Sequence, residues 1–161
     1  MVDARAAALR ILPAAPDAAA PLAQLAAGQL EAGLPRRLWT PARLQAHLRD
    51  PAVVALRALQ ERRVLGYGVI RCDGATAFLD LIVVEPDARR LGIGRALFGA
   101  LSAHVATLGA IAIDLDVRAS NVAAQRFYAA LGFLVAGRRP RHYCGVEDAV
   151  CLRRAVRAGG S

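Results

Sequence analysis

The stretch from residue 81 to residue 97, LIVVEPDARRLGIGRAL, constrains the fold of this chain more than any other part of its sequence. An apolar run ends at Val84, a turn with Gly92 and Gly94 follows, and the turn opens directly into a helical pattern. Such a junction points backbone N–H groups and the positive end of a helix dipole at one spot, where glycines leave room for a phosphate. The same glycines also suit a tight turn that binds nothing. A dinucleotide-binding Rossmann site is disfavoured, because its third glycine would stand where Leu97 is.

Periodicity and turn signals place this junction in a single α/β (α+β) domain over residues 1–161, a length that suits one domain. Helices are predicted at 17–30, capped by Asp17, at 41–49, capped by Thr40, from about 97 to 108, and from Asn121 to 131, ended by Gly132. Strands are predicted at 6–12, 53–59, 64–71, 75–84, 111–117, 133–136 and 149–152. The order βααβββαβαββ predicts a mixed sheet with helices on both faces.

The charge of this chain comes from arginine alone. The formal net charge is +8, and all 21 basic residues are arginines. The absence of lysine excludes a Schiff-base lysine and a phosphate loop ending in Gly-Lys. An arginine excess suits a polyanionic partner such as nucleic acid, a ribosome surface or a phosphate-bearing cofactor, whereas a genome rich in arginine and alanine codons gives the same excess without one.

Cysteine and hydropathy patterns bound the location of the chain. The three cysteines have no metal-ligand spacing and the three histidines are scattered, so neither a disulfide framework nor a metal site is predicted. The longest uncharged run, 96–113, is interrupted by polar residues and by Gly109, which favours a buried helix and strand over a membrane span. The charged and proline-containing start is unlike a signal peptide. We therefore expect a cytoplasmic protein without membrane contact.

A second motif specifies the family. Residues 116–121, DVRASN, and 127–133, FYAALGF, follow the Arg89-x-x-Gly92-x-Gly94 turn. Together the two motifs resemble the signatures of the GNAT superfamily of acyl-CoA-dependent N-acyltransferases, over about residues 64–152. The resemblance implies the GNAT fold, a mixed and mostly antiparallel sheet flanked by helices, and acetyl-CoA as cosubstrate without a metal.

Within the superfamily, the chain looks most like the RimI-type N-terminal protein acetyltransferases. The run 116–121, the spacing to Tyr128, and Tyr143 followed by Glu147 carry this likeness. It implies acetylation of the N-terminal alanine of a small-subunit ribosomal protein, with nucleic-acid contact only if the enzyme works on the ribosome.

The resemblance also implies cofactor-binding residues. The pantetheine arm and its acetyl thioester would pair with the backbone of Ile82, Val83 and Val84. Asn121 would contact the pantetheine or adenylate side. The pyrophosphate would be held by the backbone amides of Arg90, Leu91, Gly92, Ile93, Gly94 and Arg95.

Two residues carry the chemistry in this resemblance. Tyr128, with a reference pKa of about 10, would donate a proton to the departing thiolate. Asp116 aligns with a catalytic Glu and is one methylene shorter, so Asp80 and Glu85 stay open as alternative bases, and an ion pair with Arg118 or another arginine is the structural alternative. An α-amine with a pKa of about 7.8 is already roughly 14 % neutral at pH 7, so a weak base suffices.

The resemblance also implies that the acceptor binds between two loops. Residues 33–40, with Trp39, form one, and residues 138–146, with Tyr143, form the other. Cys144 stands where the family usually has a second tyrosine, and arginines crowd this loop. These arginines suit contact with ribosomal RNA, solvent or a CoA phosphate. Two alternatives therefore stay open: a GNAT enzyme that acts on a small-molecule amine, and a non-enzymatic acyl-CoA-binding or ribosome-binding module.

Overall fold

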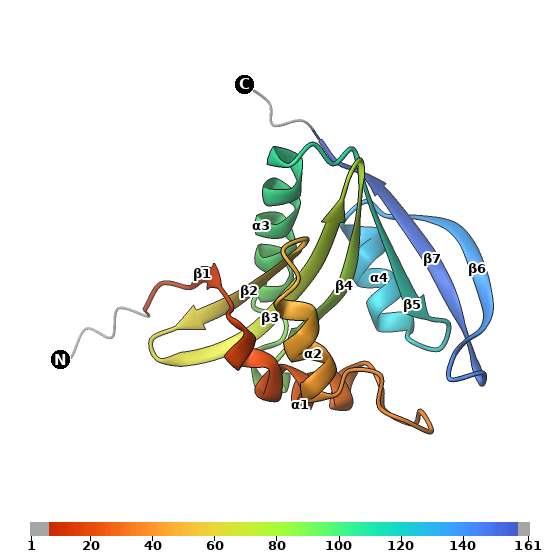
Figure 1. The fold of residues 1–161 in the computed structure, drawn as a ribbon, viewed down its shortest axis with the longest axis horizontal. Helices are drawn as coiled ribbons and strands as arrows, with labels where there is room; N and C mark the ends of the chain where they lie inside the picture. Colours follow the sequence, from red (N-terminus) through yellow and green to blue (C-terminus); the bar gives the residue numbers. More distant parts are fainter. Residues whose placement is uncertain (1–6, 158–161) are drawn as a thin grey trace.

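A mixed seven-stranded sheet organises the computed structural model, which describes residues 7–157 (Figure 1). Its strands, in chain order, are β1 (Arg10–Pro13), β2 (Val53–Gln60), β3 (Arg63–Asp73), β4 (Thr76–Val84), β5 (Ala112–Arg118), β6 (Leu134–Tyr143) and β7 (Glu147–Ala155). The helices are α1 (Ala19–Gln29), α2 (Pro41–Leu48), α3 (Ile93–Thr107) and α4 (Val122–Ala130). The predicted order βααβββαβαββ is confirmed.

The strands lie in the order β1-β2-β3-β4-β5-β7-β6. Every neighbouring pair is antiparallel except β4 and β5, which are parallel. The predicted mixed, mostly antiparallel sheet is therefore confirmed. No helix in the described part of the chain is long and apolar enough to cross a membrane.

Helices cover both faces of the sheet, as predicted. On one face α1 and α2 bury Leu22 and Leu44 against Leu81 and Val83 of β4. On the other face Phe98 of α3 and Tyr128 of α4 belong to a larger core. That core also contains Ile70, Leu79, Ile113, Leu115, Val117 and Leu152 from the sheet. The amphipathic pattern of each helix thus selects its face.

The two parallel strands separate after a short contact. Residues 76–78 of β4 pair with residues 112–114 of β5, and beyond them the strands diverge (Figure 1). On its other side β5 pairs with β7 along its whole length, from Ala112 opposite Ala155 to Arg118 opposite Ala149. The sheet therefore opens between β4 and β5, on the carboxyl side of both strands.

A β-bulge in β4 lies beside this opening. Val69 pairs with Leu81 and Ile70 pairs with Leu79, so Asp80 is an extra residue without a partner on β3. Leu79 packs on the α3 side, whereas Leu81 packs on the α1 and α2 side. A bulge places consecutive residues on the same side and redirects their side chains. Nothing in the apolar pattern of residues 75–84 predicted it.

The structure corrects three predicted boundaries. Residues 138–143, expected in a loop, continue β6, so the turn before β7 contains only 144–146. Side chains along β6 are almost all exposed, so the strand has no apolar alternation to reveal it. Asp17 does not cap α1, because residues 16–18 form a 3-10 turn and Ala18 is the N-cap. The first strand begins at Arg10, and residue 6 of its predicted range lies outside the described residues.

Candidate active site

A cavity of ≈ 560 Å³ occupies the opening between β4 and β5. Its walls come from β4, β5, the turn before α3, the start of α4 and the segment that joins α1 to α2. Residues from five distant parts of the chain thus meet where the sheet separates. Ligand sites in open sheets of this kind form where neighbouring strands diverge.

The N-terminus of α3 forms one end of the cavity. Gly92, the N-cap, has φ 78°, a left-handed conformation that favours glycine. The first-turn amides of a helix lack intrahelical partners, so they remain available to an anion. A Cβ at Gly94 would lie 3.2 Å from Cζ of Phe127, which also lines the cavity. A side chain at position 94 would therefore crowd Phe127 at this end of the cavity.

The free edge of β4 is covered by a side chain from α1. The side-chain amide of Gln29 donates to the carbonyl of Val84 at 2.5 Å and accepts from the N–H of Val84 at 3.2 Å. The next N–H, of Glu85, bonds to β3 through Leu65. Gln29 thus satisfies the backbone groups that face away from β3. This residue was not predicted from the sequence, because Gln29 and Val84 are 55 residues apart in the chain.

Tyr128 reaches the cavity from α4. It is buried, with its ring edge-on to Phe127 at 5.0 Å and to Phe133 at 5.5 Å between centroids. Burial raises the pKa of its hydroxyl well above the ordinary value. The hydroxyl therefore keeps its proton at neutral pH and can act as a donor.

Asp116 lies on β5 with its side chain between two groups of β6. Its Oδ2 is 3.5 Å from Nε of Arg139 and 3.6 Å from Nε2 of His142. The sequence left open an ion pair between Asp116 and Arg118 or another arginine. In the structure Arg139 pairs with Asp116, whereas Arg118 pairs with Glu147. Burial, together with the charge of Asp116, raises the pKa of the neighbouring Tyr143 hydroxyl.

A second carboxylate, Asp80, lines the cavity from the bulge in β4. Nε2 of His47, on α2, donates to its Oδ2 at 2.7 Å. The His47 ring in turn lies 5.4 Å from the ring of Trp39. Burial raises the pKa of Asp80, although His47 and Arg71 oppose the shift. Asp80 is thus a buried carboxylate on the side of the cavity that Trp39 occupies.

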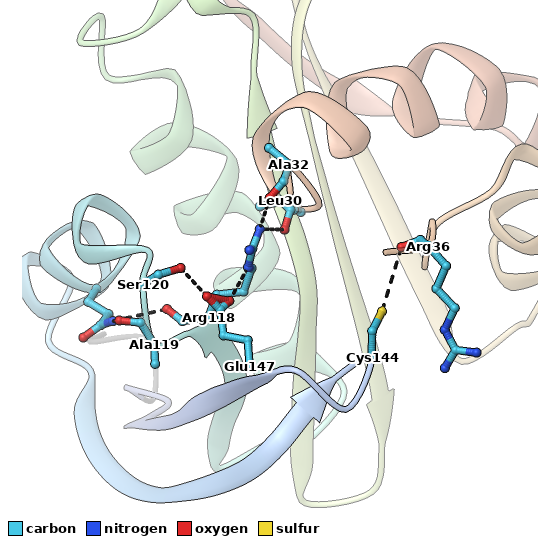
Figure 2. Close-up of polar contacts among 9 residues, drawn as sticks. Leu30, Ala32, Arg36, Arg118, Ala119, Ser120, Cys144 and Glu147 are labelled. Carbon is cyan, nitrogen blue, oxygen red and sulfur yellow. Dashed lines mark hydrogen bonds and ion pairs between the residues drawn. The ribbon is translucent and has the colours of Figure 1, made fainter. Parts of the chain in front are cut away.

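Arg118 joins the α1–α2 segment to the start of β7 (Figure 2). Its Nη1 donates to the carbonyls of Leu30 at 3.2 Å and Ala32 at 2.7 Å, at the end of α1. Its Nε donates to Glu147 at 2.5 Å, and the hydroxyl of Ser120 donates to the same carboxylate. The guanidinium therefore connects the end of α1, 86 residues before it in the chain, with the start of β7, 29 residues after it.

Glu31 organises the segment that Arg118 holds. Its Oε1 accepts from the N–H of Trp39 at 2.6 Å, and its Oε2 lies 3.3 Å from Nε of Arg37. The side chain is 2 % exposed, so this buried carboxylate holds residues 37 and 39 of the segment together. Farther along, the Cys144 thiol contacts the carbonyl of Arg36 at 3.9 Å (Figure 2). Both predicted acceptor segments therefore meet at the mouth of the cavity.

The comparison with protein families decides the identity of this arrangement. The Acetyltransferase (GNAT) family model matches residues 21–133. This chain belongs to the GNAT acetyltransferase family. The expected fold and the expected class of enzyme, an acetyl-CoA-dependent N-acetyltransferase, are thereby confirmed at the level of the family.

Curated relatives of this GNAT chain include two enzymes named [Ribosomal protein bS18]-alanine N-acetyltransferase. The Salmonella typhimurium relative is 35% identical over 100 residues, which are 60% of this chain and 68% of the relative. The Escherichia coli relative is 42% identical over 83 residues, 50% of this chain and 55% of the relative. The chain thus spans between about half and two thirds of the length of these relatives. The predicted resemblance to RimI-type enzymes is confirmed.

A solved structure extends the likeness over the whole fold. The crystal structure of the ribosomal-protein-S18-alanine N-acetyltransferase from Escherichia coli superposes with a TM-score of 0.78 at 25% identity. The match covers 96% of this chain and 97% of that one.

Acetyl-CoA, the cosubstrate of the GNAT family, fits the residues present. A side chain at position 94 would meet Phe127, which also lines the cavity, and Arg89, Arg90 and Arg95 line the cavity around the α3 N-terminus. These donors suit a pyrophosphate. Within residues 7–157 no cluster of three or more His, Cys, Asp or Glu side chains is arranged to hold a metal ion.

Most residues predicted for the site in this GNAT chain line the one cavity. They are Trp39, Ile82, Val84, Arg90, Gly92, Ile93, Gly94, Arg95, Asp116, Asn121, Tyr128 and Tyr143. The Val83 side chain is buried in the α1–α2 core, and that of Leu91 is 69% exposed, so these two could contribute only their backbones. Asn121 also caps α4 by accepting from the N–H of Ala124, as predicted.

Proposed function

We propose that this chain transfers the acetyl group of acetyl-CoA to the N-terminal α-amine of a protein, and that its acceptor is the N-terminal alanine of ribosomal protein bS18. The observation that carries the proposal is the single cavity that joins the α3 N-terminus, Tyr128 and the Trp39–Tyr143 mouth. The names of the two curated relatives, which are 35% and 42% identical, support the acceptor.

The ends of the cavity have different roles in this proposal. The amides from Arg90 to Arg95 hold the pyrophosphate, and the backbone of residues 82–84 with Asn121 holds the pantetheine. The acceptor peptide enters between Trp39 and Tyr143. Acetyl-CoA supplies an activated acetyl thioester when bound.

Direct transfer of the acetyl group has two requirements. The neutral acceptor amine must be positioned against the thioester carbonyl, which the walls of the cavity do by excluding other orientations. The leaving sulfur must receive a proton, and we assign this role to Tyr128, whose buried hydroxyl stays protonated. Of the carboxylates, Asp116 lines the same cavity as Tyr128 and Tyr143.

The cellular setting follows from the proposed acceptor. Ribosomes are cytoplasmic, so the chain would act in the cytoplasm, as one domain over residues 1–161. It would touch nucleic acid only while associated with the ribosome. No membrane contact is part of this proposal.

The experiment is an assay of thiol release from acetyl-CoA. The acceptors are peptides that begin with the bS18 sequence, with Ala, Ser, Met or Gly, together with internal-lysine peptides and small amines. Turnover confined to N-terminal Ala or Ser peptides supports the proposal. Turnover with small amines alone contradicts the acceptor, and acetyl-CoA binding without turnover contradicts the enzyme.

A further inference from the structure

We propose that Asp80, oriented by His47, is the base that takes a proton from the α-ammonium group of the acceptor. The inference rests on the proposed function and deepens it, because it assigns the deprotonation step to a pair of residues on β4 and α2. Three observations support it: the bulge that turns Asp80 toward α2, the partners of Asp80, and the different partners of Asp116.

The bulge places Asp80 on the acceptor side of the cavity. Asp80 has no partner on β3, and its side chain reaches His47 on α2, the face on which Leu81 also packs. Ile82, two residues later, packs on the opposite face, toward α3. The backbone of residues 82–84 is the segment that we assign to the thioester arm. Asp80 therefore lines the cavity next to that segment, on the α1–α2 side.

The surroundings of Asp80 suit a base. Its side chain is 9% exposed, and the charged or titratable groups that act on it are His47 from α2 and Arg71 from β3. Nε2–H of His47 donates to Oδ2 at 2.7 Å, which fixes the carboxylate and leaves Oδ1 to receive a proton. Burial raises the pKa of Asp80, although His47 and Arg71 oppose the shift. A carboxylate with a raised pKa accepts protons more readily at neutral pH.

His47 also connects the base to the acceptor mouth. Its ring lies 5.4 Å from the ring of Trp39, whose backbone N–H donates to Glu31. His47 therefore contacts both the proposed base and a residue of the proposed acceptor wall. Trp39 borders the mouth, so an amine that enters beside it arrives on the side of Asp80.

Neither competing carboxylate has this arrangement. Oδ2 of Asp116 lies 3.5 Å from Nε of Arg139 and 3.6 Å from Nε2 of His142, so this carboxylate already pairs with an arginine of β6. Glu85 does not line the cavity. Its backbone N–H bonds to Leu65 on β3, because the residue belongs to the turn that follows β4.

Oδ1 of Asp80 takes one proton from the α-ammonium group, and the freed nitrogen forms a bond to the acetyl carbon while the carbon–sulfur bond breaks. Tyr128 gives a proton to the departing sulfur and regains one from the acetylated nitrogen. The proton on Asp80 passes to water. One ammonium group and one thioester thus give one amide, one thiol and one proton.

The test is the pH dependence of kcat/KM for the acceptor that the wild-type enzyme uses, in Asp80→Asn and Asp116→Asn. We expect Asp80→Asn to lower kcat/KM about 10–100-fold at pH 7, with the loss shrinking as the pH rises past the α-amine pKa of about 7.8. Asp116→Asn should give a smaller loss that does not change with pH. A pH-dependent loss in Asp116→Asn, or a wild-type profile in Asp80→Asn, overturns the proposal.

His47 supplies a matched pair of variants that separates positioning from folding. His47→Gln keeps an N–H donor toward Asp80 and should retain most of the activity, whereas His47→Ala should show the same pH-dependent loss as Asp80→Asn. Equal profiles for the two His47 variants overturn the orienting role. If the wild type acetylates only small amines, the proposed function fails, while the same profiles taken against the pKa of that amine still test Asp80.

Discussion

Nε of Arg118 on β5 donates a 2.5 Å hydrogen bond to the carboxylate of Glu147 at the start of β7. The same guanidinium holds the carbonyls of Leu30 and Ala32, where α1 ends. One side chain of the DVRASN motif thus fixes the acceptor segment against the β6–β7 hairpin (Figure 2). The motif therefore shapes the mouth of the cavity as well as its interior.

The first prediction concerns the stability that this ion pair provides. Arg118 lowers the pKa of Glu147, so the contribution is present above the unfolded value near 4.5 and is lost as the pH falls through the lower folded value. Glu147→Gln should lower the free energy of unfolding by about 1 kcal/mol at pH 7, since solvent partly screens the pair. The difference between variant and wild type should vanish below about pH 3 in urea unfolding. Asp87→Asn, which removes an exposed ion pair with Arg63, is the control and should show no change.

A second prediction compares the two residues first assigned to catalysis. Tyr128→Phe should lower kcat about 100-fold with the KM for acetyl-CoA unchanged, because the sulfur loses its proton donor. Asp116→Ala should lower kcat only moderately, by about tenfold, because it releases Arg139 and His142 without removing the donor. Steady-state assays of both variants give the answer. Negligible losses in both would refute the assignment.

The third prediction addresses the amide that covers the edge of β4. The side-chain amide of Gln29 bonds to the N–H and the carbonyl of Val84. We assign the same backbone groups to the pantetheine arm, so Gln29 must move before the arm can pair with Val84. Gln29→Ala should lower the free energy of unfolding of the free protein by about 1 kcal/mol. It should also lower the Kd for acetyl-CoA about fivefold, the ratio that corresponds to this free energy. Calorimetric titration measures the binding, and Gln125→Ala, on α4, is the control. Weaker binding in Gln29→Ala would mean that this side chain assists the cosubstrate.

A fourth prediction uses two glycines on one helix. An added Cβ at Gly94 meets Phe127 at 3.2 Å, whereas at Gly99 it meets nothing within 4 Å. Gly94→Ala should raise the Kd for acetyl-CoA about tenfold, because the methyl group occupies the space beside the α3 N-terminus. Gly99→Ala should leave the Kd unchanged and stabilise the fold by about 0.5–1 kcal/mol, the usual gain from alanine inside a helix. Equal effects on the Kd would show that Gly94 gives no access to the ligand.

Local sequence determined the order of the elements and the composition of most of the site. Apolar periodicity revealed the core strands and helices, and caps such as Thr40 and Asn121 act within three residues of themselves, so sequence reasoning could find them. The turn at 85–95 and the DVRASN motif are equally local. In both segments the donors and acceptors at the start of a helix lie within a few residues of one another. For that reason the GNAT resemblance could be inferred before any coordinates.

Tertiary structure alone decided which distant groups meet. Asp80 and His47 are 33 residues apart, and Gln29 and Val84 are 55 apart. Their contacts depend on the strand register, and the bulge at Asp80 shifts that register by a residue with no signal in the apolar pattern. The exposed strand β6 was hidden for a related reason, since backbone hydrogen bonds to β7 stabilise it and they leave no trace in side-chain hydropathy. The sequence therefore determines which side chains are present for a site, whereas the packing of separate helices and strands determines which of them come into contact.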